Sequence, residues 1–196
     1  MSYIYLASRS PRRQTLLTQL GLPFRVLDVQ VDEHRDGGEP PRAYVLRLAL
    51  EKARAGLRAR QASDAYPVLA ADTAVVIDDE VLGKPEDSDQ ALAMLERLSG
   101  RCHQVYTAVA LAGGIELAAL SVSRVEFRLL NEAEQRAYAR SEEPFGKAGG
   151  YAVQGFAASF ISRIEGSYSG IVGLPLYETA QLLKQGGIDG TPPPVA

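Results

Sequence analysis

The feature that most constrains this chain is the apolar run Val-Leu-Ala-Ala-Asp-Thr-Ala-Val-Val-Ile at residues 68–77. Its length and its valines and alanines predict a buried strand, interrupted only by Asp72 and Thr73. A carboxylate there is costly unless a cation, a metal ion or hydrogen-bond donors meet it. A strand end or a structural ion pair would also accommodate Asp72, but such a carboxylate can equally serve as a general base or metal ligand. We therefore take Asp72 as the first candidate catalytic residue.

Strand and helix patterns alternate along the rest of the chain. Strands are expected at residues 3–7, 24–31, 81–82, 105–111, 117–129 and 156–164, and helices at 11–20, 41–60, 88–98, 131–140 and 176–184. Ser10 stands as N-cap before Pro11, and Asn131 with Glu134 predicts a capping box. Crossover connections give parallel strand pairs and hairpins give antiparallel ones. The predicted fold class is therefore α/β, with a mixed β-sheet flanked by helices.

Length and composition favour one globular domain. The 196 residues are 46% hydrophobic and 23% charged, enough for a sizeable core. We expect a single domain over residues 1–189 and a Pro-rich tail at 190–196. The absence of a long apolar run or a signal-peptide pattern, with one cysteine, predicts a cytoplasmic protein without membrane contact. The net charge of −3 provides no field for nucleic acid, so phosphates would be bound by a few local cations.

The segment Ser8-Arg-Ser-Pro-Arg-Arg13 follows a predicted strand and opens a helix. Free backbone N–H groups would face the same space as Arg12 and Arg13, whose guanidinium groups suit phosphate oxygens. A solvated helix start with ordinary surface arginines fits the same pattern. However, cations at a helix N-terminus oppose the helix dipole, and this unfavourable choice suggests that an anion binds there.

Two lysines and one acid complete the candidates around Asp72. Lys52 lies on the apolar stripe of the helix at 41–60, so it either reaches the surface or points into a cleft. Lys84 follows a predicted hairpin that would return it toward Asp72, although a loop lysine is usually only solvated. Glu33 lies in a polar loop, where acids are common, and could help to hold a divalent ion.

Residues 147–155, Lys-Ala-Gly-Gly-Tyr-Ala-Val-Gln-Gly, carry one cation, Lys147, and one amide, Gln154. The amide offers a donor and an acceptor and could read a base edge, although a glycine-rich loop alone is a weak signal. The chain contains neither a Walker A motif nor G-x-G-x-x-G. Cys102 and His103, as neighbours, would point to opposite faces of a strand, and both are interpreted as structural.

Six ordered segments of the chain resemble the Maf family of nucleoside triphosphate pyrophosphatases, and the resemblance extends from residue 6 to about residue 183. The segments are Leu6-Ala-Ser-Arg-Ser-Pro-Arg-Arg13, Glu51-Lys-Ala53, Ala71-Asp-Thr73, Gly83-Lys-Pro85, Lys147-Ala-Gly-Gly-Tyr151 with Gln154-Gly155, and Gly166-Ser-Tyr-Ser-Gly-Ile-Val-Gly-Leu-Pro-Leu-Tyr-Glu-Thr179. Lys147 and Gln154 make the loop similar to that of the branch acting on dTTP and UTP. The branch acting on 7-methyl-GTP typically has Cys and Glu at these two positions.

The resemblance implies roles for the candidate residues. Asp72 would be the proton acceptor, with Lys52 and Lys84 as further catalytic residues. The substrate-binding residues would be Ser8, Ser10, Arg12, Arg13, Thr73, Lys147 and Gln154, of which Arg12, Thr73 and Gln154 would govern substrate choice. The resemblance also implies a two-lobed fold with a central cleft, similar to inosine triphosphatases, a divalent cation (Mg²⁺ or Mn²⁺) and a homodimer. Asp72 and Glu33 are the candidate metal ligands.

Two positions depart from the family pattern. Arg9 stands where the family usually has a small residue, and Gly146 stands where an Asp usually precedes Lys147. The first change adds positive charge near the phosphate loop, and the second removes a carboxylate beside Lys147. Neither change alters Asp72.

The sequence thus predicts an enzyme that cleaves dTTP and UTP, and modified pyrimidine nucleotides, to the monophosphate and pyrophosphate. One alternative is a non-hydrolysing nucleotide sensor that regulates cell division through a partner. A carboxylate positioned as a base argues against it, because a sensor needs none. Another alternative is a pyrophosphatase for non-canonical purine nucleotides such as ITP, which a ranking of substrates would distinguish.

Overall fold

In the computed structural model, the long apolar run forms strand β3 (Val68–Ile77), as predicted. The structure describes residues 3–61 and 64–190, and within them β3 is an inner strand of a seven-stranded sheet. The strand order is β2-β1-β3-β5-β6-β7, and β4 pairs with β3 outside this path. β1 (Ile4–Leu6) runs parallel to β2 (Phe24–Val26) and to β3, whereas the other pairs are antiparallel. The predicted mixed sheet is confirmed.

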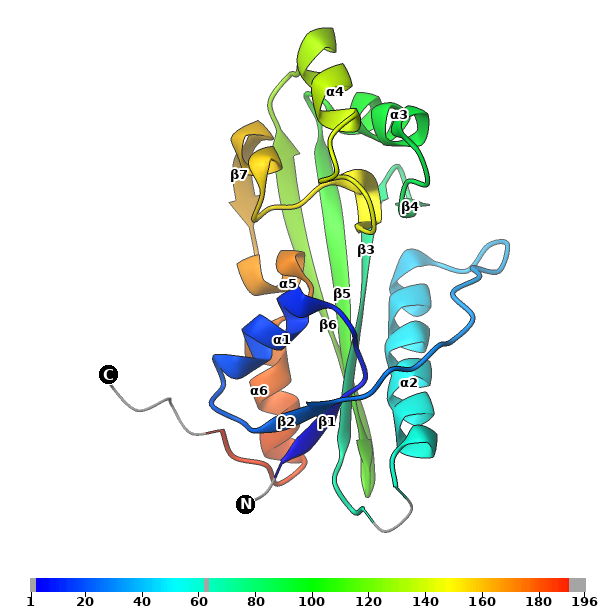
Figure 1. Cartoon of the computed structure of the whole chain (residues 1–196), viewed down its shortest axis with the longest axis vertical. Coiled ribbons are helices and arrows are strands. Elements are labelled where there is room, and N and C mark those ends of the chain that lie inside the picture. The colour runs from blue at the N-terminus through cyan, green and yellow to red at the C-terminus, as the bar shows by residue number, and fades with distance from the viewer. Residues whose placement is uncertain (1–2, 62–63, 191–196) are drawn as a thin grey trace.

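A long β-hairpin runs along the length of the molecule (Figure 1). It consists of β5 (Cys102–Gly113) and β6 (Ile115–Phe127), and β7 (Ile161–Glu165) pairs with the far side of β6. Gly113 and Gly114 make the turn with φ values of 129° and 79°, which side-chain-bearing residues rarely adopt. Helices gather around both ends of this hairpin, which gives the expected two lobes.

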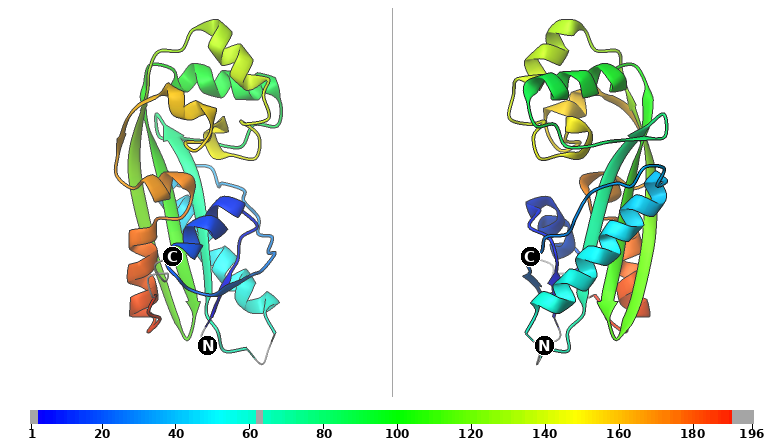
Figure 2. Two further views of the ribbon diagram at one scale, coloured as in Figure 1. Left: turned by 60° about the vertical axis from the view of Figure 1, so that its left-hand side comes forward. Right: turned by 90° about the vertical axis from the view of Figure 1, so that its right-hand side faces the viewer.

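The helices cover both faces of the sheet. Helix α2 packs on one face, against β3 and β5, while α1, α5 and α6 lie on the other, and α3 and α4 cover the upper end (Figures 1 and 2). Their bounds are α1 (Pro11–Thr18), α2 (Pro41–Ala59), α3 (Ser88–Leu98), α4 (Glu132–Ala139), α5 (Tyr168–Val172) and α6 (Leu176–Gln185). The capping box predicted for α4 is present. The apolar stripe predicted on α2 is buried, as expected.

The alternation of side chains along β3 sends its two polar residues to different faces. Ala70 and Ala74 belong to the core beneath α2, whereas Ala71 belongs to the core on the opposite face. Because successive residues of a strand point to opposite sides, Asp72 faces α2 and Thr73 faces the side of α1 and α5.

One edge of β3 is only partly paired. β1 pairs with Val68 and Leu69, and β4 (Glu80–Leu82) pairs from Val75 onward, after a turn at residues 78–79. Between them, residues 70–74 have no strand partner on that edge in the described part of the chain, while β5 continues along the other edge. The sheet therefore has a gap in its hydrogen-bonding beside Asp72.

Three expectations at the strand ends were wrong. The strand expected at 24–31 is the shorter β2, which ends at Val26. Leu129 is 79% exposed, because β6 ends at Phe127, where the pairing with β7 shifts register. The first half of the strand expected at 156–164 is the 3₁₀ helix η2 (Phe156–Phe160). It cannot start as a strand because its first two N–H groups donate to the carboxylate of Glu143.

The Pro-rich tail lies outside the described residues except for Gly190. Among the helices that the structure describes, none is long and apolar enough to cross a membrane.

Candidate active site

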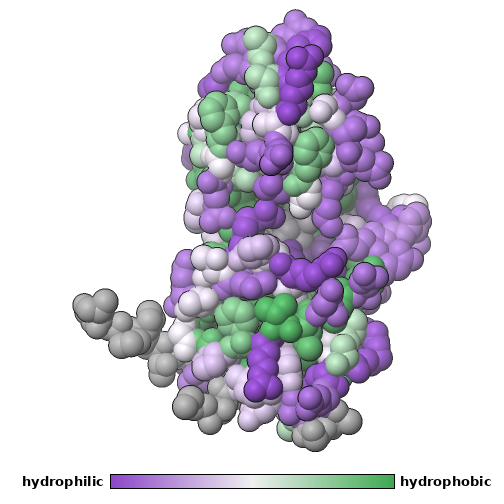
Figure 3. Space-filling view, in the orientation of Figure 1, coloured by the Kyte–Doolittle hydropathy of each residue, from purple (hydrophilic) through white to green (hydrophobic). Residues whose placement is uncertain are grey.

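A cleft of about 480 Å³ opens at the unpaired edge of β3, between the loop that follows β1 and the end of β4. This volume suits a small-molecule ligand. Figure 3 shows a hollow at the waist of the molecule, bordered by hydrophilic residues. The cleft is lined by every residue that the sequence predicted for the site: Ser8, Ser10, Arg12, Arg13, Glu33, Lys52, Asp72, Thr73, Lys84, Lys147 and Gln154.

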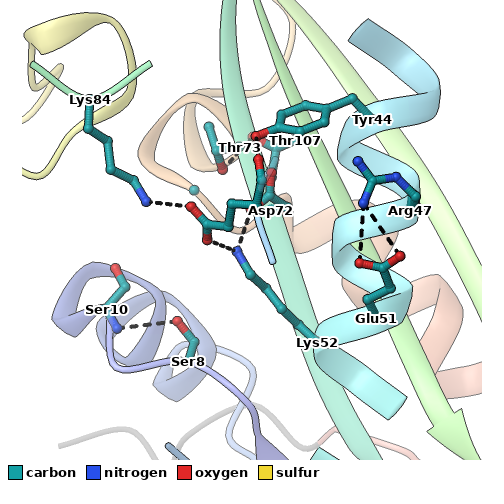
Figure 4. A network of polar contacts seen from close by, with 12 residues as sticks. Ser8, Ser10, Tyr44, Arg47, Glu51, Lys52, Asp72, Thr73, Lys84 and Thr107 are labelled. Carbon is teal, nitrogen blue, oxygen red and sulfur yellow. Dashed lines mark hydrogen bonds and ion pairs between the residues drawn. The ribbon is translucent and has the colours of Figure 1, made fainter. Parts of the chain in front are cut away.

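Four charged side chains form a continuous chain of ion pairs across the cleft. Figure 4 labels Lys52, Asp72 and Lys84 among them. Lys52 Nζ lies 2.6 Å from Asp72 Oδ1 and 2.6 Å from Glu33 Oε1. Lys84 Nζ lies 2.9 Å from the other oxygen of Glu33. Asp72 is therefore paired with a cation, as a carboxylate in an otherwise apolar strand requires.

The position of Lys52 follows from the packing of α2 on the sheet. The apolar stripe of the helix faces β3, and Lys52 stands on that stripe opposite the face of the strand that carries Asp72. Its side chain is only 13% exposed. Of the two readings that the sequence left open, the structure supports the one in which Lys52 points into a cleft.

Glu33 holds the two lysines together from an exposed loop. Burial alone would raise the pKa of Glu33, but hydrogen bonds to Lys52 and Lys84 and their charges outweigh this and lower the pKa to about 2. Its side chain is 42% exposed, so solvent screens these interactions in part. Glu33 thus stays a carboxylate over the ordinary range of pH.

The first turn of α1 points Arg13 inward beneath the cleft. Arg13 Nε donates to the carbonyl of Gly173 at 2.7 Å, and its terminal nitrogens lie 3.4 Å from Ser8 Oγ and 3.2 Å from Thr73 Oγ1. Ser10 is the N-cap residue of α1 by position, but its side chain makes no capping hydrogen bond. The first N–H groups of α1 are therefore not satisfied by this side chain, which is compatible with an anion at the helix start.

Positive charge exceeds negative charge in the cleft. Burial lowers the pKa of both Arg12 and Arg13; for Arg13 the charge of Asp72 opposes this shift and that of Arg12 adds to it. Burial and Arg12 likewise lower the pKa of Lys147. The lining contains six basic side chains and two carboxylates, a surplus of four positive charges in a chain whose net charge is −3. Such crowding of cations favours the binding of a polyanion.

The glycine-rich loop forms the upper wall of the cleft. Gly149 has a φ of 69°, and a Cβ at this position would lie 2.8 Å from the side chain of Val75. Only glycine therefore lets the loop pack this closely on β3. Lys147 Nζ donates to the carbonyl oxygens of Glu143 at 2.6 Å and Phe145 at 3.3 Å, while Gln154 lies exposed at the rim.

The two departures from the family pattern also lie at the cleft. Arg9 lines its rim and forms an exposed ion pair with Asp28 at 3.2 Å. Gly146 has a φ of 70°, a conformation that glycine adopts without strain. Lys147 is satisfied by backbone carbonyls of its own loop, so it has partners without a carboxylate at position 146.

The cleft offers few ligands for a divalent cation. Nowhere among the described residues do three or more His, Cys, Asp or Glu side chains gather as a metal site. Asp72 and Glu33 supply two carboxylates that face one shared point, at present held by Lys52. Mg²⁺ is commonly bound by one or two carboxylates together with substrate phosphates, so this pair fits such an ion when a polyphosphate completes the coordination.

Sequence reasoning missed two residues of the site. Tyr44 lines the cleft from α2, two turns before Lys52, and its hydroxyl donates to the backbone carbonyl of Glu33 at 2.9 Å. Thr107 is the cross-strand partner of Thr73, and its hydroxyl lies 3.0 Å from that of Thr73 and 2.7 Å from the carbonyl of Gly170. Helical spacing from Lys52 could have indicated Tyr44. Thr107 could be identified only from the register between β3 and β5, which the sequence does not give.

Cys102 and His103 lie away from the cleft lining, on β5, with Cys102 exposed and His103 buried. Their interpretation as side chains on opposite faces of a strand is confirmed. His103 Nε2 lies 2.8 Å from the hydroxyl of Tyr151, which does line the cleft.

Comparison with known proteins identifies close relatives. Residues 3–186 match the profile of the Maf family, described as Maf-like protein. A protein of Xanthomonas campestris named dTTP/UTP pyrophosphatase is 54% identical over 94% of this chain and 98% of its own length. One of Alkalilimnicola ehrlichii with the same name is 52% identical over 95% of this chain and 94% of its own. A Xylella fastidiosa protein named nucleoside triphosphate pyrophosphatase is 52% identical over 92% of this chain and 96% of its own.

Proposed function

The chain belongs to the Maf family, and we propose that it hydrolyses nucleoside triphosphates, dTTP and UTP foremost, to the monophosphate and pyrophosphate. The observation that carries the proposal is the meeting of Asp72 with six basic side chains in one cleft. The names of relatives that are more than half identical along nearly their whole length support the choice of pyrimidine triphosphates.

The loop that follows β1 and the first turn of α1 would bind the phosphates. Arg13 is already oriented by the carbonyl of Gly173 and the hydroxyl of Thr73, so little freedom is lost when it meets a phosphate oxygen. Arg12, Ser8 and Ser10 line the same side of the cleft and would supply further donors. A bound polyphosphate would relieve the repulsion between Arg12 and Arg13.

The chemical step would be attack by water at the α-phosphorus. The water oxygen forms a bond to this phosphorus while the bond to the oxygen that bridges to the β-phosphorus breaks. Asp72 would accept the proton of the water through its second oxygen, because Lys52 engages only Oδ1 in the free protein. Lys52 and Lys84 would stabilise the charge on the departing pyrophosphate. The choice of the α–β bond rests on the names of the relatives.

A divalent cation, when bound, would supply stabilisation of the charged phosphoryl oxygens. Asp72 and Glu33 are the side chains proposed to hold it, together with the substrate phosphates. Lys52 and Lys84 would then turn from the carboxylates toward the phosphates.

The glycine-rich loop would recognise the base. Gln154 lines the cleft and is exposed, and its amide can match both a donor and an acceptor on the pyrimidine edge. Thr73 would act at the phosphate end instead, because its hydroxyl is engaged by Arg13 and Thr107. The proposed partner is therefore a small-molecule nucleotide; a cytoplasmic location, where such nucleotides are made, and a homodimer are further proposals.

A panel of nucleoside triphosphates tests the proposed function. The purified protein is incubated with dTTP, UTP, CTP, ATP, GTP and ITP in the presence of Mg²⁺ or Mn²⁺, and released pyrophosphate is measured. We expect the highest kcat/KM with dTTP and UTP. A preference for ITP would instead favour the purine pyrophosphatase, and binding without release would favour the nucleotide sensor.

A further inference from the structure

The carboxylate of Glu143 makes three hydrogen bonds that none of the proposed chemistry uses. Its Oε2 accepts the backbone N–H of Phe156 at 2.7 Å. Its Oε1 accepts the backbone N–H of Ala157 at 3.1 Å and the hydroxyl of Tyr138 at 2.9 Å. We call these four residues the Glu143 clamp. It joins the end of α4 to the chain that leaves the glycine-rich loop.

The clamp closes directly over Gly155. A Cβ built at Gly155 would lie 2.4 Å from the carboxyl carbon of Glu143, closer than atoms can approach. The backbone of Gly155 is extended, with φ of −108°, so its conformation does not require glycine. The close approach of the Glu143 carboxylate is therefore the reason why this position suits a glycine.

Residue 143 contacts the glycine-rich loop directly at Lys147 and holds the chain just after Gln154. Lys147 Nζ donates to the backbone carbonyl of Glu143 at 2.6 Å. Gln154 stands at the third position of a turn in which Gly155 N–H donates to Ala152 O at 3.0 Å, and the clamp holds the two residues that follow this turn. Glu143 itself is absent from the cleft lining, so it acts from behind the loop.

We propose that Glu143 is a positioning residue for substrate choice, whose carboxylate fixes the place of Gln154 at the rim of the cleft. The inference rests on the proposed function, in which Gln154 reads the base. Hydrogen bonds to a carboxylate are stronger than those between neutral groups, so the clamp holds the loop more firmly than turn geometry alone. When it is removed, Gln154 samples more positions and must be ordered by the substrate.

The two ends of the substrate should respond differently. The phosphate end would be held by the start of α1 and by the chain of ion pairs at Asp72. Neither of these contacts the clamp. Loss of the clamp should therefore weaken base discrimination and leave the chemical step intact. A residue that merely supports the fold would instead lower the activity with all nucleotides alike.

The test compares Glu143→Gln with Gly155→Ala, which breaks the same contact from its other side, and with Glu142→Gln at the exposed neighbouring acid as the control. Glu143→Gln keeps the side-chain shape but turns an amide NH₂ toward at least one of the three donors. In both clamp variants the ratio of kcat/KM for dTTP to that for CTP should fall about tenfold, mainly through KM for dTTP. The control should retain the wild-type ratio.

Hydrogen exchange gives a readout that needs no activity. The amide protons of Phe156 and Ala157 should exchange about tenfold or more faster in Glu143→Gln than in the wild type, because their acceptor is lost or weakened. An unchanged dTTP-to-CTP ratio in both clamp variants would overturn the role of Glu143 in substrate choice, whatever the exchange rates, and so would an equal loss with every nucleotide. If the wild-type protein releases no pyrophosphate at all, the proposed function fails; the clamp then stands or falls on the exchange data and on the relative binding of dTTP and CTP.

Discussion

Lys52 on α2 donates from Nζ to Oδ1 of Asp72 on β3, at 2.6 Å, across the main packing contact between helix and sheet. The same interface that buries the apolar stripe of α2 therefore sets the geometry of the candidate catalytic carboxylate. Glu33 extends this contact to Lys84, so that a core contact and two loops converge on one point.

Replacement of Lys52 by Met should abolish most of the activity. The variant keeps the length of the side chain but removes the cation between Asp72 and Glu33, and with it the charge stabilisation proposed for the leaving group. We expect kcat/KM for dTTP to fall by about 100-fold or more. Arg54→Met on the same helix, which loses only an exposed pair with Glu116, is the matched control. The expected kcat/KM of Lys52→Met is about 100-fold below that of the control. A value within about threefold of the control would refute the role of Lys52.

Thr107→Val should raise KM with less effect on kcat. Valine has nearly the same shape but loses the hydroxyl that lies between Thr73 and the carbonyl of Gly170, and Thr73 in turn holds Arg13. The unpaired buried carbonyl should cost about 1–3 kcal/mol of folding free energy. Steady-state kinetics with dTTP and thermal unfolding measure the two effects. An unaltered KM in a destabilised variant would mean that Thr107 serves the fold alone.

Stability should fall as the pH is lowered from about 6.5, because of His103. Burial lowers the pKa of this histidine from 6.5 to about 4, and its Nδ1 has no hydrogen-bond partner in the described chain. As the pH falls, the unfolded chain therefore takes up a proton on His103 before the folded chain does. The stability associated with the neutral histidine is fully present above pH 6.5 and is lost toward pH 4. The loss should reach on the order of 2–3 kcal/mol.

Urea unfolding between pH 7.5 and about 5 measures this dependence. Glu33 does not contribute to it in this range: the pKa of Glu33 is about 2 in the folded protein, so the stability that Glu33 provides declines only below its ordinary pKa of 4.5. His103→Gln should flatten the pH dependence, and His34→Gln, at an exposed histidine, should not. Identical curves for the wild type and His103→Gln would contradict the assignment.

Chelation with EDTA should stop hydrolysis, and added Mg²⁺ or Mn²⁺ should restore it. Because Asp72 and Glu33 alone offer few ligands, Mn²⁺ should bind weakly to the free protein and more tightly once a nucleotide is present. Paramagnetic resonance of free Mn²⁺ follows both states. The tightening should be reduced in Glu33→Gln; tight binding without nucleotide would indicate a metal site of a different kind.

The helices and strands were predictable where the periodicity of apolar residues or the capping residues gave a strong local signal. The run that forms β3, the stripe of α2 and the capping box of α4 each carry a strong local signal, and the structure confirms them. Leu129 continued the alternation of β6 by sequence but lies outside the strand, since a register shift with a distant strand ends the pairing. The helix η2 could not be predicted because its cause is Glu143, thirteen residues upstream of Phe156.

The site residues could be chosen from the sequence, but their contacts could not. Asp72 was conspicuous because an acid in an apolar strand needs a partner, and the resemblance to a family supplied most of the others. That Lys52 is the partner depends on how α2 lies across β3, and the cleft itself depends on where β1 ends and β4 begins. These are relations between distant segments, which local periodicity does not encode.

Product analysis of Asp72→Asn against the wild type shows whether Asp72 is the base for cleavage between the α- and β-phosphates. Pyrophosphate and orthophosphate released from dTTP are quantified separately with Mg²⁺ present, and circular dichroism and thermal unfolding establish that the variant is folded. We expect pyrophosphate and dTMP in equal amounts from the wild type, and a loss of about 1,000-fold in turnover for the variant. Orthophosphate as the first product, or near-normal turnover by Asp72→Asn, would contradict this expectation.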